Sequence, residues 1–204
     1  MSAVSDASAW VRRWAHLIRP GGQVLDVACG RGRHLRWLHA QGFQPTGVDR
    51  DRDAVEGLAS LARIVVADLE GGPWPLPGER FDAVVVTNYL WRPQWPALRD
   101  ALAPGGVLLY ETFADGQQTI GRPSRPDFLL QPGELLSLAQ GLRVVAFEDG
   151  FEDGLEGGLR DGGTPDANAA PRFVQRIAAV AQDGDAGGPA PTRHRLAGPW
   201  RGGR

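Results

Sequence analysis

Two short stretches of the chain contain the residue types that bind nucleotides. The first, at residues 24–34, reads VLDVACGRGRH and joins an apolar run and an acid to two glycines, Gly30 and Gly32. Glycines let the backbone turn sharply and approach a ligand, and a following helix presents free N–H groups and the positive end of its dipole. The second stretch, GVDRD, places Asp49 after another apolar run. Together they predict a site for a ligand that carries an anionic group.

Three acids, Asp26, Asp49 and Asp68, lie at or near the ends of predicted strands. Asp49, after the second strand, is placed to accept both hydroxyls of a ribose, and Asp68, after the third, to accept from an adenine amino group. Because the strand order reverses beside the first strand, these groups converge at one crevice. The pattern favours a ligand with an adenosine at one end and an amino-acid carboxylate at the other.

The same loop argues against a nicotinamide dinucleotide. A dinucleotide fingerprint needs a third glycine three residues after the second, where it allows close packing of helix and strand, but Leu35 stands there. The chain also has no lysine, so it lacks a Tyr-x-x-x-Lys pair. A nicotinamide-dependent oxidoreductase is therefore the weaker alternative.

Strand and helix patterns alternate along the chain, which predicts an α/β fold with parallel strand pairing. Residues 171–182 favour a strand because Val174, Ile177 and Val180 are β-formers, with a helix as the alternative. The expected elements are strands at residues 23–28, 45–49, 62–69, 81–90, 107–114, 142–150 and 171–182, and helices at residues 8–19, 32–42, 52–62, 95–106 and 132–141.

Composition predicts one main domain. The 204 residues are 42% apolar, enough for one continuous core. We expect a capping helix within residues 1–19, the domain at 20–181 and a disordered tail at 182–204. Residues 115–132 are a long connection of the kind that forms a lid, a binding loop or a disordered segment, and residues 151–170 are expected to be mobile.

Charge and cysteine content narrow the partners. The formal net charge of −2 gives no global basic field, so nucleic acid is not an expected partner. The single cysteine, Cys29, and four scattered histidines lack metal-ligand spacing, so no metal is expected. The polar start of the chain resembles no signal peptide, and no apolar run is long enough to span a membrane. These features predict a cytoplasmic protein without a membrane partner.

The order of five stretches carries a family resemblance. VLDVACGRGRH, GVDRD, VVADLE, FDAVVVTNYL and LAPGGVLLYETF follow one another as in the class I S-adenosylmethionine-dependent methyltransferases. The resemblance covers residues 20–181 and implies a Rossmann-like α/β fold, with six parallel strands, a last antiparallel strand and helices on both faces. The variant CGRGRH is similar to small bacterial methyltransferases of the tellurite-resistance and thiopurine types. The implied cofactor is S-adenosyl-L-methionine.

The resemblance also implies roles for single residues. Asp26 would orient the glycine loop or accept from the methionine amino group, and Asn88 would lie near the sulfonium. Arg33 would pair with the cofactor carboxylate or be an ordinary solvated arginine. Gly30 and Gly32 would line the methionine portion, Asp49 would take the ribose hydroxyls, and the adenine would lie beside Arg50, Asp68 and Leu69. The implied cofactor-binding set is Asp26, Ala28, Gly30, Gly32, Arg33, Asp49, Arg50, Asp68, Leu69 and Asn88.

The acceptor and any catalytic base are less determined. His34, Tyr89, Glu111 and His16 are the candidate bases by placement, with His34 and Tyr89 preferred, although His34 also fits a packed or capping residue and Tyr89 a rim residue. The stretch TNYL resembles the Asn-Pro-Pro-aromatic motif of amino-methylating enzymes but lacks both prolines, which argues against a nucleobase or glutamine acceptor. A small-molecule acceptor is favoured. A non-catalytic protein that binds the methyl donor remains a second interpretation, and the sequence gives no oligomeric state.

Overall fold

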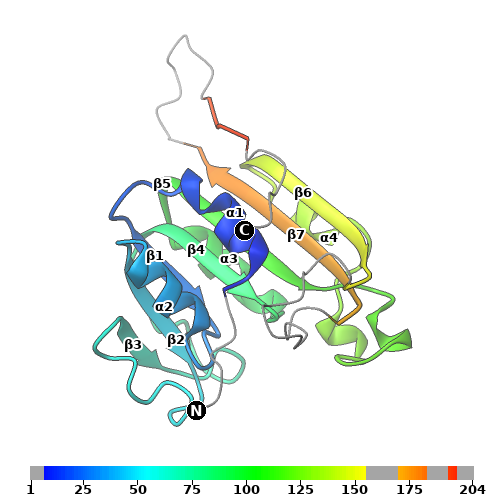
Figure 1. The fold of residues 1–204 in the computed structure, drawn as a ribbon, viewed down its shortest axis with the longest axis horizontal. Helices are drawn as coiled ribbons and strands as arrows, with labels where there is room; N and C mark the ends of the chain where they lie inside the picture. The colour runs from blue at the N-terminus through cyan, green and yellow to red at the C-terminus, as the bar shows by residue number, and fades with distance from the viewer. Residues whose placement is uncertain (1–6, 155–169, 183–192, 197–204) are drawn as a thin grey trace, which may run out of the picture.

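A seven-stranded sheet runs through the molecule in the order β3-β2-β1-β4-β5-β7-β6 (Figure 1). All neighbouring pairs among β3, β2, β1, β4 and β5 are parallel, whereas β7 is antiparallel to both β5 and β6. Six strands therefore share one direction and β7 opposes them, which confirms the predicted sheet. The strands are β1 (Gln23–Val27), β2 (Gln44–Asp49), β3 (Arg63–Val66), β4 (Phe81–Thr87), β5 (Leu102–Phe113), β6 (Leu142–Glu152) and β7 (Arg172–Ala181).

The computed structural model describes residues 7–154, 170–182 and 193–196. Most of the segment expected to be mobile and most of the tail expected to be disordered lie outside these residues. Residues 171–182, for which a helix was the alternative, form strand β7 as predicted. Among the described residues, no helix is long and apolar enough to cross a membrane.

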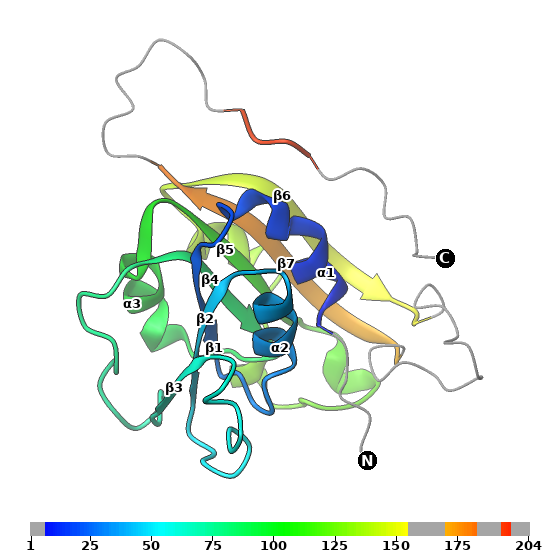
Figure 2. The ribbon, with the colours of Figure 1, turned by 60° about the vertical axis from the view of Figure 1, so that its left-hand side comes forward.

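Two helices cover each face of the sheet (Figures 1 and 2). On the first face, α1 (Ala9–Trp14) and α2 (Arg33–Ala40) pack on alternate strand residues such as Val85. On the second, α3 (Trp95–Asp100) and α4 (Glu134–Leu138) pack on the intervening residues such as Val86. Successive strand residues point to opposite faces, so strands buried on both faces read as continuous apolar runs.

One predicted helix is wrong. Residues 52–62 form a series of turns instead of a helix. The Asp51 side chain accepts hydrogen bonds from the backbone N–H groups of Asp53 and Ala54, each at 3.0 Å, as an N-cap does, so a first turn forms there but is not continued. Gly57 then adopts φ +78°, a left-handed conformation that ends any helical turn begun before it.

Two further helices begin or end at other residues than predicted. The helix expected at 95–106 ends at Asp100, because Leu102 already pairs with Phe81 as the first residue of β5. The helix expected at 132–141 begins at Glu134 after Gly133, so Pro132 precedes the first turn instead of starting it. Strand pairing therefore set the end of α3, whereas the left-handed conformation of Gly133 precedes the start of α4.

The long connection after β5 is held by buried glutamines. The Gln117 side chain donates to the carbonyl of Arg122 and accepts from the N–H of Phe173 in β7. Gln175, which is fully buried, donates to the carbonyl of Gln131 and accepts from the N–H of Leu135. Both ends of the connection are therefore attached to β7, which makes it an ordered wall beside the carboxyl end of β5.

Gly47 sets how closely α2 approaches the sheet. A Cβ atom at this position of β2 would lie 2.7 Å from Leu35 Cδ1 and 2.8 Å from Cys29 Sγ. We predict that Gly47→Ala lowers the free energy of unfolding by about 1 to 3 kcal/mol, since overpacking forces α2 and the glycine loop away from β2. Urea unfolding measures this. Gly150→Ala, in open space, is the control; equal stabilities of the two variants would contradict the prediction.

Candidate cofactor site

The crevice that positions the site lies where the strand order reverses. β1 and β4 are neighbours in the sheet, yet β1 continues into α2 on the first face and β4 leads to α3 on the second. The loops that follow them therefore part, and the carboxyl ends of β1, β2 and β4 border the space between. This is the crevice that the sequence predicted.

The glycine loop is fixed to the end of β2. Gly30 N–H donates to Asp49 Oδ2 at 2.7 Å, and Cys29 N–H donates to the carbonyl of Val48 at 3.0 Å. Gly30 has φ +52°, and nothing lies within 4 Å of the position where its Cβ would be. Gly32 has φ +73°, and a Cβ there would lie 2.6 Å from Leu58 Cδ1. Gly30 thus leaves open space beside the loop, whereas Gly32 allows close packing.

Asp49 keeps hydrogen-bonding capacity after its protein contacts. Its Oδ2 accepts from Gly30 and its Oδ1 accepts from the N–H of Asp51 at 2.9 Å. A carboxylate has about four lone-pair sites, so each oxygen can accept a second hydrogen bond. The side chain is half-buried and faces a pocket. It is therefore preorganised to accept hydrogen bonds from a ligand.

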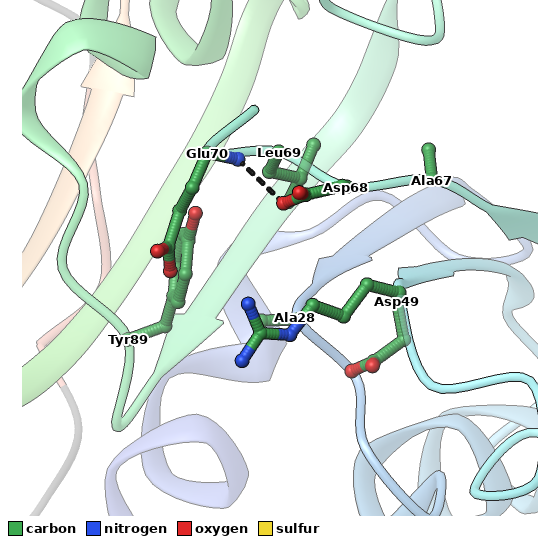
Figure 3. A pocket seen from close by; sticks show the side chains of 8 residues that line it. Ala28, Asp49, Ala67, Asp68, Leu69, Glu70 and Tyr89 are labelled. Atoms are coloured by element: carbon green, nitrogen blue, oxygen red, sulfur yellow. Dashed lines mark hydrogen bonds between the residues drawn. The ribbon is translucent and has the colours of Figure 1, made fainter. Parts of the chain in front are cut away.

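A pocket opens between the ends of β2 and β3, Ala28 just after β1, and Tyr89, which follows β4 (Figure 3). It brings together six residues that the sequence singled out and two that it did not. The predicted ones are Ala28, Asp49, Arg50, Asp68, Leu69 and Tyr89; the missed ones are Ala67 and Glu70. Ala67 and Glu70 flank Asp68 and Leu69 in the stretch VVADLE, so their adjacency was the only available signal.

Asp68 shapes the wall of this pocket as well as lining it. Its Oδ1 accepts from the N–H of Glu70 at 3.0 Å, and its carbonyl accepts from the N–H of Gly72. The N–H of Ala67 donates to the carbonyl of Asp49, which fastens the end of β3 to the end of β2. The exposed carboxylate of Asp68 therefore sits on a short, defined turn.

The other predicted cofactor residues do not line this pocket. They lie in β1, in the glycine loop and directly after β4. Asn88, which follows β4, is exposed with φ +55°, and its N–H donates to the carbonyl of Glu111 at 2.9 Å. The remaining residues in this group are Asp26, Gly30, Gly32 and Arg33.

Asp26 is buried in β1, with 1% of its surface exposed. Burial raises the pKa of Asp26 to about 8. The positive charge of Arg33 acts in the opposite direction, and the negative charge of Asp49 adds to the rise. Its Oδ2 has no hydrogen-bond partner among the described residues, and lies 3.8 Å from His34 Nδ1. That separation is too long for a hydrogen bond. At neutral pH the carboxyl group is therefore mostly protonated.

His34 is buried behind the glycine loop. Its Nε2 accepts from the N–H of Ser8 at 3.1 Å, which places the ring proton on Nδ1. Burial, aided by the charge of Arg33, lowers the pKa of His34 to about 3. The contact with Asp26 is thus between two neutral groups, not an ion pair. His34 was predicted to be either a catalytic base or a packed residue. With 1% of its surface exposed and its Nε2 already hydrogen-bonded, it fits the packed residue.

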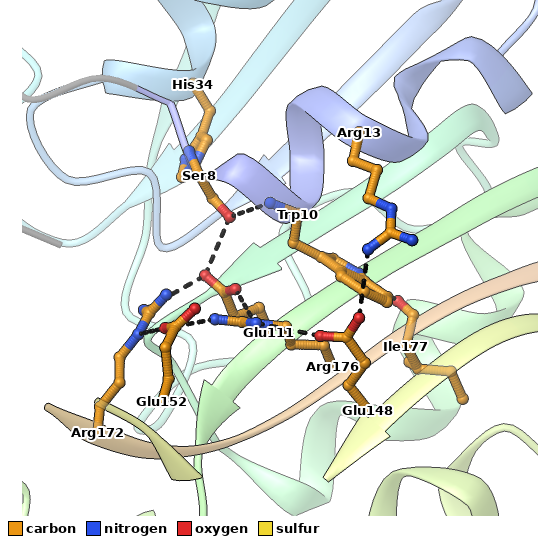
Figure 4. Close-up of polar contacts among 10 residues, drawn as sticks. All are labelled: Ser8, Trp10, Arg13, His34, Glu111, Glu148, Glu152, Arg172, Arg176 and Ile177. Carbon is orange, nitrogen blue, oxygen red and sulfur yellow. Dashed lines mark hydrogen bonds and ion pairs between the residues drawn. The ribbon is translucent and has the colours of Figure 1, made fainter. Parts of the chain in front are cut away.

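A polar network joins His34 to the sheet edge (Figure 4). The Ser8 hydroxyl caps α1 by accepting from Trp10 N–H and donates to Glu111 Oε1 at 3.0 Å. Glu111, with 1% exposure, accepts from Arg176 Nε at 2.5 Å. The rest of the network consists of Arg172, Glu148, Glu152 and Arg13. Three carboxylates and three guanidinium groups thus fasten α1 to β5, β6 and β7.

Two arginines near the connection after β5, Arg92 and Arg125, have protein partners. Arg92 donates to both carboxylate oxygens of Glu134 and to the carbonyls of Asp127 and Leu129. Arg125 donates to Asp127 Oδ2 at 2.8 Å. Within the described part of the chain, no group of three His, Cys, Asp or Glu residues could hold a metal ion.

Comparison with known proteins agrees with this fold. Residues 24–106, from β1 to the start of β5, match the family model described as a methyltransferase domain. No protein in the curated set matches the sequence significantly.

Solved structures share the fold at low sequence identity. TehB from Haemophilus influenzae is 18% identical with a TM-score of 0.65, over 86% of this chain and 63% of that one, so this chain spans under two thirds of its length. A TehB-like SAM-dependent methyltransferase from Corynebacterium glutamicum is 21% identical, with a TM-score of 0.55 over 87% and 89% of the chains. A SAM-dependent methyltransferase from Methanosarcina mazei is 15% identical, with a TM-score of 0.59 over 87% and 99%.

The raised pKa of Asp26 predicts a pH-dependent effect of Asp26→Asn. Between about pH 4 and about pH 8 the Asp26 carboxyl is ionised in the unfolded chain but stays protonated in the folded one. Ionisation therefore favours the unfolded chain, and the free energy of unfolding falls as pH rises from about 4 to about 8. The free energy of unfolding of the variant, relative to wild type, should therefore rise across this window. Urea unfolding at several pH values measures the difference.

Asp82→Asn is the matched control with the opposite sign. Burial favours a higher pKa for Asp82, but hydrogen bonds from Arg19 and Gln23 and the charge of Arg19 outweigh it and lower the pKa. That stabilisation is present above pH 4 and is lost as pH falls, so Asp82→Asn should cost stability at pH 7. A pH-independent difference for Asp26→Asn would contradict the buried, protonated carboxyl.

Proposed function

Because residues 24–106 match a methyltransferase-domain model and the fold is shared with SAM-dependent methyltransferases, we propose that the chain belongs to the class I S-adenosylmethionine-dependent methyltransferase superfamily and methylates a small-molecule acceptor. In this proposal the protein is a methyltransferase and S-adenosylmethionine is its cofactor. The observation that carries the proposed cofactor site is the half-buried Asp49 carboxylate. It is held by Gly30 and still has lone pairs directed at the pocket.

In this proposal the adenosine occupies the pocket. The ribose hydroxyls donate to Asp49, and the adenine lies between Ala28, Arg50 and Leu69, with its amino group at Asp68. These assignments are supported by chemical complementarity, because hydroxyl and amino groups are hydrogen-bond donors and carboxylates accept. They use the polar groups that line the pocket.

The methionine portion follows the glycine loop in this proposal. Gly30 and Gly32 line it, Arg33 pairs with its carboxylate, and Asn88 lies near the sulfonium. Asp26 is a positioning residue, because its buried carboxyl orients the loop from within β1. The open space beside Gly30 supports this path, since a ligand can approach the backbone there.

The chemistry needs little more than positioning. The acceptor's lone pair forms a bond to the methyl carbon while the carbon–sulfur bond breaks, and its electrons return to sulfur, leaving a neutral thioether. The sulfonium is already activated, so in-line orientation and exclusion of water supply much of the acceleration. His34 is engaged and buried, and burial raises the pKa of Tyr89, so neither is suited to act as a base near neutral pH.

A small acceptor fits the architecture of the described residues. The connection after β5 is fixed by Gln117 and Gln175, and Arg92 attaches it to the region after β4. Because this connection is fixed in place, residues at the rim of the crevice would recognise the acceptor. Cys29 is a buried free thiol, which supports the proposal that the protein works in the cytoplasm, a reducing compartment.

Asp49→Ala tests the proposed site. The variant should bind S-adenosylhomocysteine more weakly by about 1 to 3 kcal/mol, because two ribose hydroxyls lose their acceptor and Gly30 loses its partner. Isothermal titration calorimetry gives the affinity, and thermal unfolding confirms that the variant is folded. Asp100→Asn, exposed at the end of α3, is the control and should bind like wild type. Unchanged affinity of a folded Asp49→Ala variant would remove Asp49 from the site.

A further inference from the structure

The pocket contains one polar group whose partner is missing. Tyr89 lines the pocket, and its hydroxyl oxygen is buried without a hydrogen-bond partner among the described residues. Leaving a buried hydroxyl unpaired costs about 1 to 3 kcal/mol, so such groups in folded proteins nearly always have a partner. A hydroxyl in a pocket wall finds that partner when a ligand binds.

The backbone fixes where this phenol lies. Tyr89 follows Asn88, whose φ of +55° turns the chain away from β4. The carbonyl of Tyr89 accepts a hydrogen bond from the Tyr110 hydroxyl at 2.8 Å. Tyr110 is itself buried and stacked on Trp95, with ring centroids 5.1 Å apart. The main chain at Tyr89 is therefore anchored to the core.

The side chain lies on the cofactor side of the crevice. Figure 3 shows Tyr89 beside Glu70 on one side of the pocket, with Asp49 across from them. The carboxylates of Asp68, Glu70 and Asp49 are near enough to raise the pKa of the phenol, after burial as the largest cause. The hydroxyl thus stays protonated and is a hydrogen-bond donor at neutral pH.

The chemistry of the pocket indicates which ligand atom this donor meets. The three carboxylates accept hydrogen bonds and so suit the ribose hydroxyls and the adenine amino group. The ring nitrogens of adenine that carry no hydrogen are acceptors only, and none of these carboxylates can serve them. Among the side chains that line the pocket, Tyr89 has the only neutral donor, and Arg50 has the only charged one.

We propose that the Tyr89 hydroxyl donates a hydrogen bond to a ring nitrogen of the cofactor's adenine. This inference rests on the proposed function, since it requires the adenosine to occupy this pocket. It makes Tyr89 a cofactor-binding residue that selects the purine, instead of a base or an element of the acceptor site.

Calorimetry with Tyr89→Phe and deaza ligands tests the assignment. The variant keeps the ring and loses only the hydroxyl, and should bind S-adenosylhomocysteine about 2- to 13-fold more weakly, the range of one net hydrogen bond. The 1-deaza, 3-deaza and 7-deaza analogues each replace one ring nitrogen with a carbon. One analogue should show a similar loss on wild type and no further loss on Tyr89→Phe, a non-additivity that structural damage alone would not give. Trp91→Phe, at a neighbouring half-buried aromatic outside the pocket lining, is the control and should bind like wild type.

The outcomes separate this inference from the function on which it rests. If wild type binds S-adenosylhomocysteine and Tyr89→Phe binds it equally well, the assignment of Tyr89 is overturned while the cofactor site stands. The assignment is also overturned if, for all three analogues, the loss of affinity caused by the analogue and the loss caused by Tyr89→Phe add together. If wild type binds none of these ligands, the proposed cofactor site fails, and the assignment of Tyr89 fails with it.

Discussion

The hydrogen bond from Gly30 N–H to Asp49 Oδ2 is the interaction on which the site depends. It joins the loop after β1 to the last residue of β2, beside the backbone bond from Cys29 to Val48. Because β1 and β2 are parallel and in register, the two strand ends arrive together and the carboxylate needs no further adjustment. The same carboxylate that shapes the loop also faces the pocket. In the proposed function one side chain therefore sets both loop geometry and ligand recognition, which is why its replacement should affect both.

The packing behind this loop explains how the fold differs from a dinucleotide-binding site. The third glycine of the dinucleotide fingerprint allows a helix to pack closely on its strand. Here that position is Leu35, which is completely buried, and Gly47 in β2 supplies the missing space, with room for Leu35 Cδ1 and Cys29 Sγ but none for a Cβ. The close approach of helix and sheet is thus kept by a glycine on the opposite partner. A motif read along one segment misses such compensation, because the two residues meet only in the fold.

The sequence predicted the sheet and most of the pocket because those features depend on patterns along single segments. Apolar runs located β1, β2, β3 and β4, and the acids after the second and third of these strands marked Asp49 and Asp68. The expected helix at 52–62 failed because its apolar spacing gave no weight to Gly57, whose left-handed conformation ends the turn that the Asp51 side chain caps. The environment of Asp26 and His34 was likewise not predictable, since it depends on Ser8 reaching α2 across 26 residues. The assignment of single residues to cofactor atoms stays a prediction.

Titration of the wild-type protein with S-adenosylmethionine, S-adenosylhomocysteine, adenosine and NAD⁺ tests the central claim most directly. The account predicts micromolar binding of the first two, weaker binding of adenosine, which reaches the pocket but not the glycine loop, and no binding of NAD⁺. Equal affinity for adenosine and S-adenosylhomocysteine would contradict the proposed role of the glycine loop. Preference for NAD⁺, or no binding of any ligand by a folded protein, would contradict the assignment of the pocket to the methyl donor.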